Sequence, residues 1–148
     1  MPETPSTTPA PTGQDRIWLP RSNRSPSLAR RFLRELLARL DGGEHFLTDG
    51  QLLLSELVTN ALLHGTERGR LILVEATISP AALLLEVHDA SATLPEPRQA
   101  TDSDERGRGL LLVDLIADQW GCRPRPGGMG KVTWASCTPV VESSSVPQ

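Results

Sequence analysis

The apolar positions of the chain fall into short runs, and their spacing predicts both helices and strands. Residues 17–19 form a brief apolar stretch that Pro20 stops, which indicates an edge strand. A helix is predicted to begin at Ser25-Pro26, because serine is a good N-cap and proline suits the first turn. Its apolar side chains recur at helical intervals until residues 41–43 end it.

A second helix is predicted from Thr48-Asp49 to Gly65, and apolar side chains lie nearly all the way round it. A helix of this kind is usually buried. Residues 70–78 and 83–89 are typical of two strands, and the short connection through Ser79-Pro80 favours a hairpin.

Residues 90–106 show no periodicity and contain two prolines, so we predict a long loop there. A third helix follows residues 107–109 and ends at residues 120–121, and the turn-rich stretch 124–130 leads into a last strand at 131–137. Helices segregated from a sheet predict an α+β fold. We expect a two-layer sandwich of three helices and a mostly antiparallel, mixed sheet.

The length of 148 residues suits one domain with a real core, which we assign to residues 16–138. Residues 1–15 are rich in Pro, Thr and Ser, and we predict a disordered N-terminal tail there and a C-terminal one at 139–148. The chain has no apolar run of transmembrane length and no signal-peptide pattern at its start. We therefore expect a cytoplasmic protein without membrane contact.

Glu56 and Asn60 are the most informative polar residues in the second helix. They lie four residues apart, so the carboxylate and the amide share one face, together with apolar side chains. Buried polar groups without partners are costly. A metal ion or a charged ligand would supply a partner for this pair.

Asp89 ends the second strand of the hairpin on a face that is otherwise apolar (Leu83, Leu85 and Val87). One interpretation is that its carboxylate caps the following turn. The other is that it accepts hydrogen bonds inside a pocket, for example from a nucleobase amino group.

Two glycine-rich stretches differ in what they indicate. Gly107-Arg108-Gly109 opens a helix, where backbone N–H groups and the positive end of the dipole favour an anion. Residues 127–131 resemble a P-loop superficially, but Arg125 replaces its first glycine and Val132 its Ser/Thr. A hairpin turn is the better interpretation of that second stretch.

The net charge of −3 argues against bulk nucleic-acid binding. Between Arg16 and Arg39, however, seven arginines stand against one acid, Glu35. This run is either a solvated helix face or a docking surface for an acidic protein. The two cysteines, Cys122 and Cys137, lack metal-site spacing and are interpreted as small core side chains.

The order of these motifs resembles the GHKL superfamily of ATP-binding domains, which includes gyrase and the histidine kinases. Glu56-Leu57-Val58-Thr59-Asn60-Ala61 is similar to its N-box, Asp89 to its first glycine box, and Gly107-Arg108-Gly109-Leu110 to its second. Gly130-Lys131 before a Trp-containing last strand, and the Arg-Ser-Asn-Arg-Ser segment at 21–25, are closest to the anti-sigma factor serine/threonine kinase family.

The resemblance implies a role for each matching residue. Glu56 would be the catalytic general base, Asn60 would bind Mg²⁺, and Asp89 would bind the adenine amino group. A lid at about 91–106 would close over ATP. The nucleotide-binding set would comprise Asn60, Asp89, Ser91, Arg106, Gly107, Arg108, Gly109, Leu110 and Thr133. His64 could also reach the site, or could simply help to close the helix before Gly65.

Two positions depart from the family pattern: Ser91 stands where the first glycine box has glycine, and Val132 stands where threonine often follows Gly-Lys. The resemblance implies a kinase that transfers phosphate from Mg-ATP to an anti-anti-sigma protein and sequesters a sigma factor. Such proteins are commonly homodimers. The alternatives are a nucleotide-gated binding module without kinase activity, which Ser91 suggests, and a stand-alone histidine-kinase-type domain.

Overall fold

The structure is a computed structural model that describes residues 12–65, 71–90, 105–127 and 130–140. Within these ranges the chain forms three α-helices, which are α1 (Ser25–Ala38), α2 (Leu47–Asn60) and α3 (Glu105–Ile116). A 3-10 turn, η1 (Gly43–Phe46), precedes α2, and a π-helical turn, η2 (Ala61–Gly65), follows it. The strands are β1 (Gly13–Leu19), β2 (Ile72–Ile78), β3 (Leu83–Asp89), β4 (Gln119–Pro124) and β5 (Lys131–Cys137).

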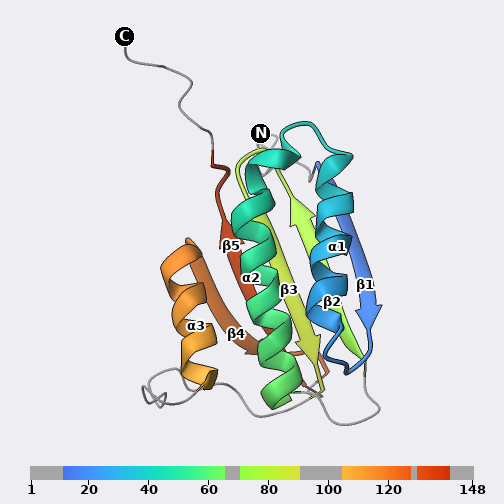
Figure 1. Cartoon of the computed structure of the whole chain (residues 1–148), viewed down its shortest axis with the longest axis vertical. Helices are drawn as coiled ribbons and strands as arrows, with labels where there is room; N and C mark the ends of the chain where they lie inside the picture. The colour runs from blue at the N-terminus through green and yellow to red at the C-terminus, as the bar shows by residue number, and fades with distance from the viewer. Residues whose placement is uncertain (1–11, 66–70, 91–104, 128–129, 141–148) are drawn as a thin grey trace, which may run out of the picture.

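The five strands form one sheet in the order β1-β2-β3-β5-β4, and the four pairings between these described strands are all antiparallel. The three helices lie side by side over one face of the sheet (Figure 1). The predicted α+β sandwich is confirmed, with a sheet more regular than the mixed one expected.

Alternation along the central strands places the core between the sheet and the helices. On β3, Leu83, Leu85 and Val87 are fully buried, and they pair with β2 and β5 residues that face the same side. Helix α2 supplies the other half of this core, with completely buried side chains at Leu53, Leu54, Leu57 and Val58. The buried character predicted for the second helix is thus confirmed on its sheet-facing side.

Strand β4 was not predicted. The third helix ends at Ile116, and the segment expected to finish that helix and begin a turn forms a strand instead. As a half-exposed edge strand, β4 has no apolar alternation to mark it. Gly121 leaves room for the ring of Trp134 opposite it, since an added Cβ would come within 3.1 Å of that ring.

Two segments that composition assigned to the terminal tails make backbone hydrogen bonds to the rest of the fold. Gly13–Asp15, placed in the N-terminal tail by composition, pair with β2, so β1 is longer than the predicted strand. Near the other end, the Val140 N–H donates to the His45 carbonyl at 2.9 Å, although residues from 139 onward were predicted to be a tail. Both segments are held by backbone hydrogen bonds, which cannot be predicted from amino-acid composition.

The start of α1 also differs from the prediction. Ser25 is the first residue of the helix, and its hydroxyl donates to the Pro20 carbonyl at 2.5 Å instead of capping the helix. Pro26 lies in the first turn, as predicted. The serine side chain therefore ties the helix to the end of β1.

The core interpretation of the cysteines leads to a labelling test. Burial, and then the charges of Asp49 and Asp118, raise the pKa of Cys137 to about 12. Since the thiolate is the reactive form, Cys137 is expected to resist DTNB at pH 8 in the native Cys122→Ser variant and to react after unfolding in guanidinium. Rapid native-state labelling would contradict its burial.

Candidate nucleotide site

The polar motifs singled out in the sequence converge on one end of the sandwich. The C-terminal end of α2, the end of β3, the start of β5 and the first turn of α3 all lie there, at the bottom of the view in Figure 1. We call this the motif end. The antiparallel register explains part of the convergence, because it places Asp89 directly opposite Lys131.

Helix α2 brings Glu56 and Asn60 to the motif end. Asn60 is 7% exposed and is the last α-helical residue, after which the backbone widens into the π-helical turn η2. The sequence predicted one continuous helix to Gly65, so the π-turn is a correction; such turns often occur at functional sites. Glu56 is half-buried, and this burial raises the pKa of its carboxyl above the ordinary value of 4.5.

Asp89 lies on the helix-facing side of the sheet, as predicted, and it forms a buried ion pair. Its Oδ2 is 3.8 Å from Nζ of Lys131, and the two side chains are only 1% and 2% exposed. The capping interpretation of Asp89 does not account for this charged partner. Gly130-Lys131 stood out in the sequence as a family motif, but its pattern did not predict that Lys131 would pair with Asp89. That pairing follows from the register of β3 and β5.

Thr133 lies two residues farther along β5, on the same face as Asp89 and 1% exposed. Its hydroxyl is 3.6 Å from the Cys122 sulfur on β4. Val132 pairs with His88 on the opposite face. Of the two residues after Lys131, the threonine therefore faces the helices, so a valine at 132 removes no polar group from that side.

Gly130 allows β5 to start against the end of β3. Its φ is 106°, and an added Cβ would lie 2.1 Å from the Asp89 carbonyl oxygen. Only glycine fits such a position without strain. The predicted hairpin turn over residues 127–131 therefore also sets the position of the Asp89–Lys131 pair.

The second glycine box lies in the first turn of α3, which begins at Glu105, earlier than predicted. Arg106, Gly107, Arg108 and Gly109 have helical backbone, and Leu110 is buried at the end of this turn. Ser91 and most of the predicted lid lie outside the described residues. The roles of these residues in phosphate binding remain predictions.

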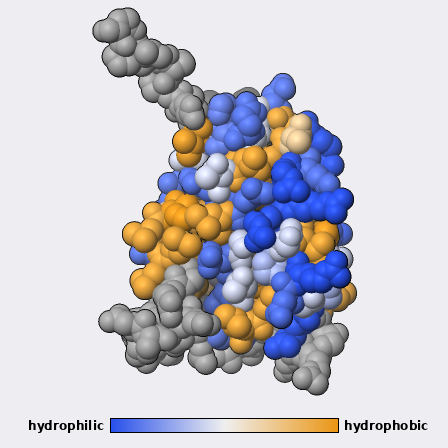
Figure 2. All heavy atoms as spheres, in the orientation of Figure 1, coloured by the Kyte–Doolittle hydropathy of each residue, from blue (hydrophilic) through white to orange (hydrophobic). Residues whose placement is uncertain are grey.

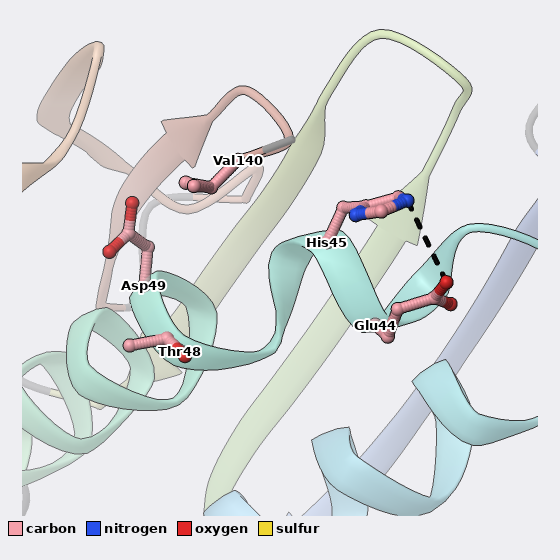
Figure 3. A pocket seen from close by; sticks show the side chains of 5 residues that line it. All are labelled: Glu44, His45, Thr48, Asp49 and Val140. Atoms are coloured by element: carbon pink, nitrogen blue, oxygen red, sulfur yellow. Dashed lines mark ion pairs between the residues drawn. The ribbon is translucent and has the colours of Figure 1, made fainter. Parts of the chain in front are cut away.

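One hollow of about 470 Å³ lies at the opposite end of the molecule. It is lined by the start of α2, by η1 and by Val140 (Figure 3), and its residues are Glu44, His45, Thr48, Asp49 and Val140. Within it, Nε2 of His45 lies 3.6 Å from a carboxylate oxygen of Glu44. None of the predicted site residues lines this hollow, so it is a feature separate from the motif end.

The donor set at the motif end fits a magnesium ion held largely by phosphates. Mg²⁺ is commonly bound by one or two protein oxygens together with substrate phosphates and water. Asn60 offers a buried amide at the end of α2. Among the described residues, no three His, Cys, Asp or Glu side chains gather into a metal-binding group, and a phosphate-held ion needs none.

The profile of the histidine kinase-like ATPase domain matches residues 19–136, which covers most of the chain and every site residue described above. The chain belongs to this family. A comparison with curated proteins finds no match. The predicted GHKL resemblance is confirmed at the level of this histidine kinase-like ATPase domain, and the match supports an ATP-binding, kinase-like fold.

The residues that match the histidine kinase-like ATPase family include those of the motif end. Asn60 and Asp89 are buried polar side chains at the positions where the N-box and first glycine box were predicted. Lys131 is the residue that sequence reasoning left without a role.

Among the described residues, no helix is long and apolar enough to cross a membrane.

Proposed function

We propose that this chain is an anti-sigma factor serine/threonine kinase that uses Mg-ATP to phosphorylate an anti-anti-sigma protein. The observation that carries the proposal is the Glu56/Asn60 pair: a half-buried carboxylate with a raised pKa, one helical turn from a buried amide. A carboxylate that can accept a proton and an amide that can hold the metal ion are what phosphoryl transfer to a hydroxyl requires.

Each residue at the motif end has a distinct part in this proposal. Asn60 would hold Mg²⁺, which when bound neutralises charge on the phosphates. Glu56 would accept the proton from the attacking serine or threonine hydroxyl at its carboxylate oxygen. Asp89 would accept a hydrogen bond from the adenine amino group, with Thr133 beside it on the same face of the sheet.

The partner surface in this proposal is the basic face of α1 with the residue before and the residue after it, and it is formed by exposed arginines at 24, 31, 34 and 39. Figure 2 shows a strongly hydrophilic surface over α1. Arg31 pairs with Glu35 at 3.2 Å and Arg39 with Asp15 at 3.5 Å, both at the surface. An acidic antagonist or sigma-factor surface would complement this face, and a homodimer is part of the same proposal.

The test is incubation of the protein with labelled Mg-ATP and a candidate antagonist, followed by phosphoamino-acid analysis. Phosphoserine or phosphothreonine with wild type, and none with Asn60→Ala, supports the kinase. ATP should also raise the melting temperature of wild type, because a ligand selective for the native state must do so. Absence of any nucleotide binding would contradict the site assignment.

The pH dependence of transfer gives a second check. Activity is expected to rise with pH through a midpoint above 4.5, because Glu56 must lose its proton to act as a base and burial raises its pKa. In the same range the folded state binds this proton more tightly than the unfolded state does, so Glu56 lowers the free energy of unfolding as pH rises. A pH–rate profile and urea unfolding at several pH values measure the two trends; Glu44→Gln, at an exposed acid, is the control.

Two other functions give different outcomes in the transfer assay. A nucleotide-gated binding module, which is the alternative that Ser91 suggests, would bind ATP but would not transfer phosphate to an antagonist. A histidine-kinase-type domain would produce phosphohistidine on a separate acceptor protein. Acid-labile label distinguishes that product from the phosphoserine or phosphothreonine expected here.

A further inference from the structure

Lys131 is the only lysine in the chain, and its side chain is almost completely buried. It extends from the helix-facing side of β5, directly opposite Asp89 on β3. The separation of 3.8 Å between Nζ and Oδ2 makes them an ion pair, although the distance exceeds that of a hydrogen bond. A cation and an anion therefore lie next to each other at the motif end.

A gain in folding stability does not by itself explain why the charged side chains of Asp89 and Lys131 are buried together. Removing two charges from water is costly, and replacing a buried pair with apolar side chains of similar volume is often neutral or stabilising. The neighbouring helix-facing positions on β3 and β5 are mostly filled by apolar side chains, such as Val87 and Ala135. A ligand with a matching donor and acceptor provides a better reason for both charges.

Adenine presents such a pattern on one edge. Its exocyclic amino group donates, and the adjacent ring nitrogen N1 accepts. A carboxylate accepts hydrogen bonds only, and a lysine ammonium donates only. Adjacent Asp89 and Lys131 side chains thus offer the complement of two neighbouring atoms on this edge, whereas Asp89 alone could bind only the amino group.

We propose that Lys131 is a base-recognition residue, which donates to N1 of adenine while Asp89 accepts from the amino group. This inference rests on the proposed nucleotide site and adds to it a second specificity contact from β5. Gly130 supports the contact, because its positive φ and its approach to the Asp89 backbone hold the two strands in register at this point.

The test uses isothermal titration of ATP, 1-deaza-ATP, which lacks the N1 acceptor, and 7-deaza-ATP. Wild type is expected to bind 1-deaza-ATP about 10-fold more weakly than ATP, the loss of roughly one hydrogen bond to a charged group. Lys131→Met is expected to bind the two equally. In both proteins 7-deaza-ATP should bind as ATP does.

Because Lys131→Met leaves Asp89 buried without this cation, its folding is checked by circular dichroism, and Asp89→Asn/Lys131→Met provides a second variant without either charge. The asparagine oxygen can still accept from the amino group, so the double variant should also bind ATP and 1-deaza-ATP equally. Val132→Thr, which changes the neighbouring residue on the opposite face, should keep the wild-type preference.

The outcomes separate this inference from the proposed function. If wild type binds ATP but the lysine variants keep the full preference over 1-deaza-ATP, or if 7-deaza-ATP is the weaker analogue, Lys131 does not recognise N1. If wild type binds no ATP, the nucleotide site itself is wrong. A purely structural lysine would change the melting temperature without changing the ratio of the two affinities.

Discussion

Glu56→Gln is expected to lower phosphate transfer to the antagonist by at least about 100-fold while leaving ATP binding intact. The glutamine keeps the size of the side chain but cannot accept a proton, and general-base catalysis contributes about 10²- to 10⁴-fold. The neutral amide also removes the charge that burial disfavours, so the free energy of unfolding should not fall. Transfer rates and the ATP-induced shift in melting temperature measure the two effects.

Two further variants define what this result means. Asn60→Ala should lose the ATP-induced thermal shift in the presence of Mg²⁺, because the side chain proposed to hold the metal ion would contribute to nucleotide binding itself. Glu44→Gln makes the same chemical change at an exposed position near the other end of α2 and should behave as wild type. Glu56→Gln protein that transfers phosphate at the wild-type rate would exclude Glu56 as the base.

Gly130→Ala is expected to be the most damaging small substitution at the motif end, and Gly127→Ala is its matched control. Both glycines lie in one turn at positive φ, 106° and 93°. A side chain at such a φ costs about 1–2 kcal/mol. An added Cβ at Gly130 would also meet the Asp89 carbonyl oxygen at 2.1 Å, whereas one at Gly127 would meet no described atom within 4 Å.

The neighbour of Gly130 is the backbone of Asp89 at the end of the middle strand β3, and a backbone carbonyl cannot rotate away as a side chain can. Overpacking costs typically about 1–3 kcal/mol, and Gly130→Ala should lose that much more stability than Gly127→Ala in urea unfolding. It should also weaken the ATP-induced thermal shift, because β3 must move at Asp89. Equal losses in the two variants would show that the strands separate freely at this turn.

The parts of the fold that could be predicted from the sequence are those in which a periodic pattern of apolar residues coincides with a buried face. Helix α2, the β2–β3 hairpin and β5 all carry such patterns, and Glu56, Asn60 and Asp89 stand out because they interrupt apolar faces. Their convergence could be predicted only through the resemblance to a family. In the structure, it follows from the strand order and from α2 and α3 running in opposite directions.

The features missed by sequence reasoning depend on partners distant in the chain. Strand β4 has little apolar surface and exists because β5 offers it a hydrogen-bonding edge. The start of β1 depends in the same way on β2. The Lys131–Asp89 pair required the register of β3 against β5, which no local pattern contains. The π-helical turn after Asn60 is only five residues long, which is too short to produce a periodic pattern in the sequence.

The hydrogen bond from Val140 to His45 fixes the last described residue beside the start of α2, whereas Asn60 ends this helix. A fluorophore or biotin attached at this residue would therefore lie at the end of the molecule opposite the motif end. Protein immobilised in this way would present the motif end to solution. The nucleotide measurements could then be made on an oriented surface, without the attachment chemistry blocking the motif end.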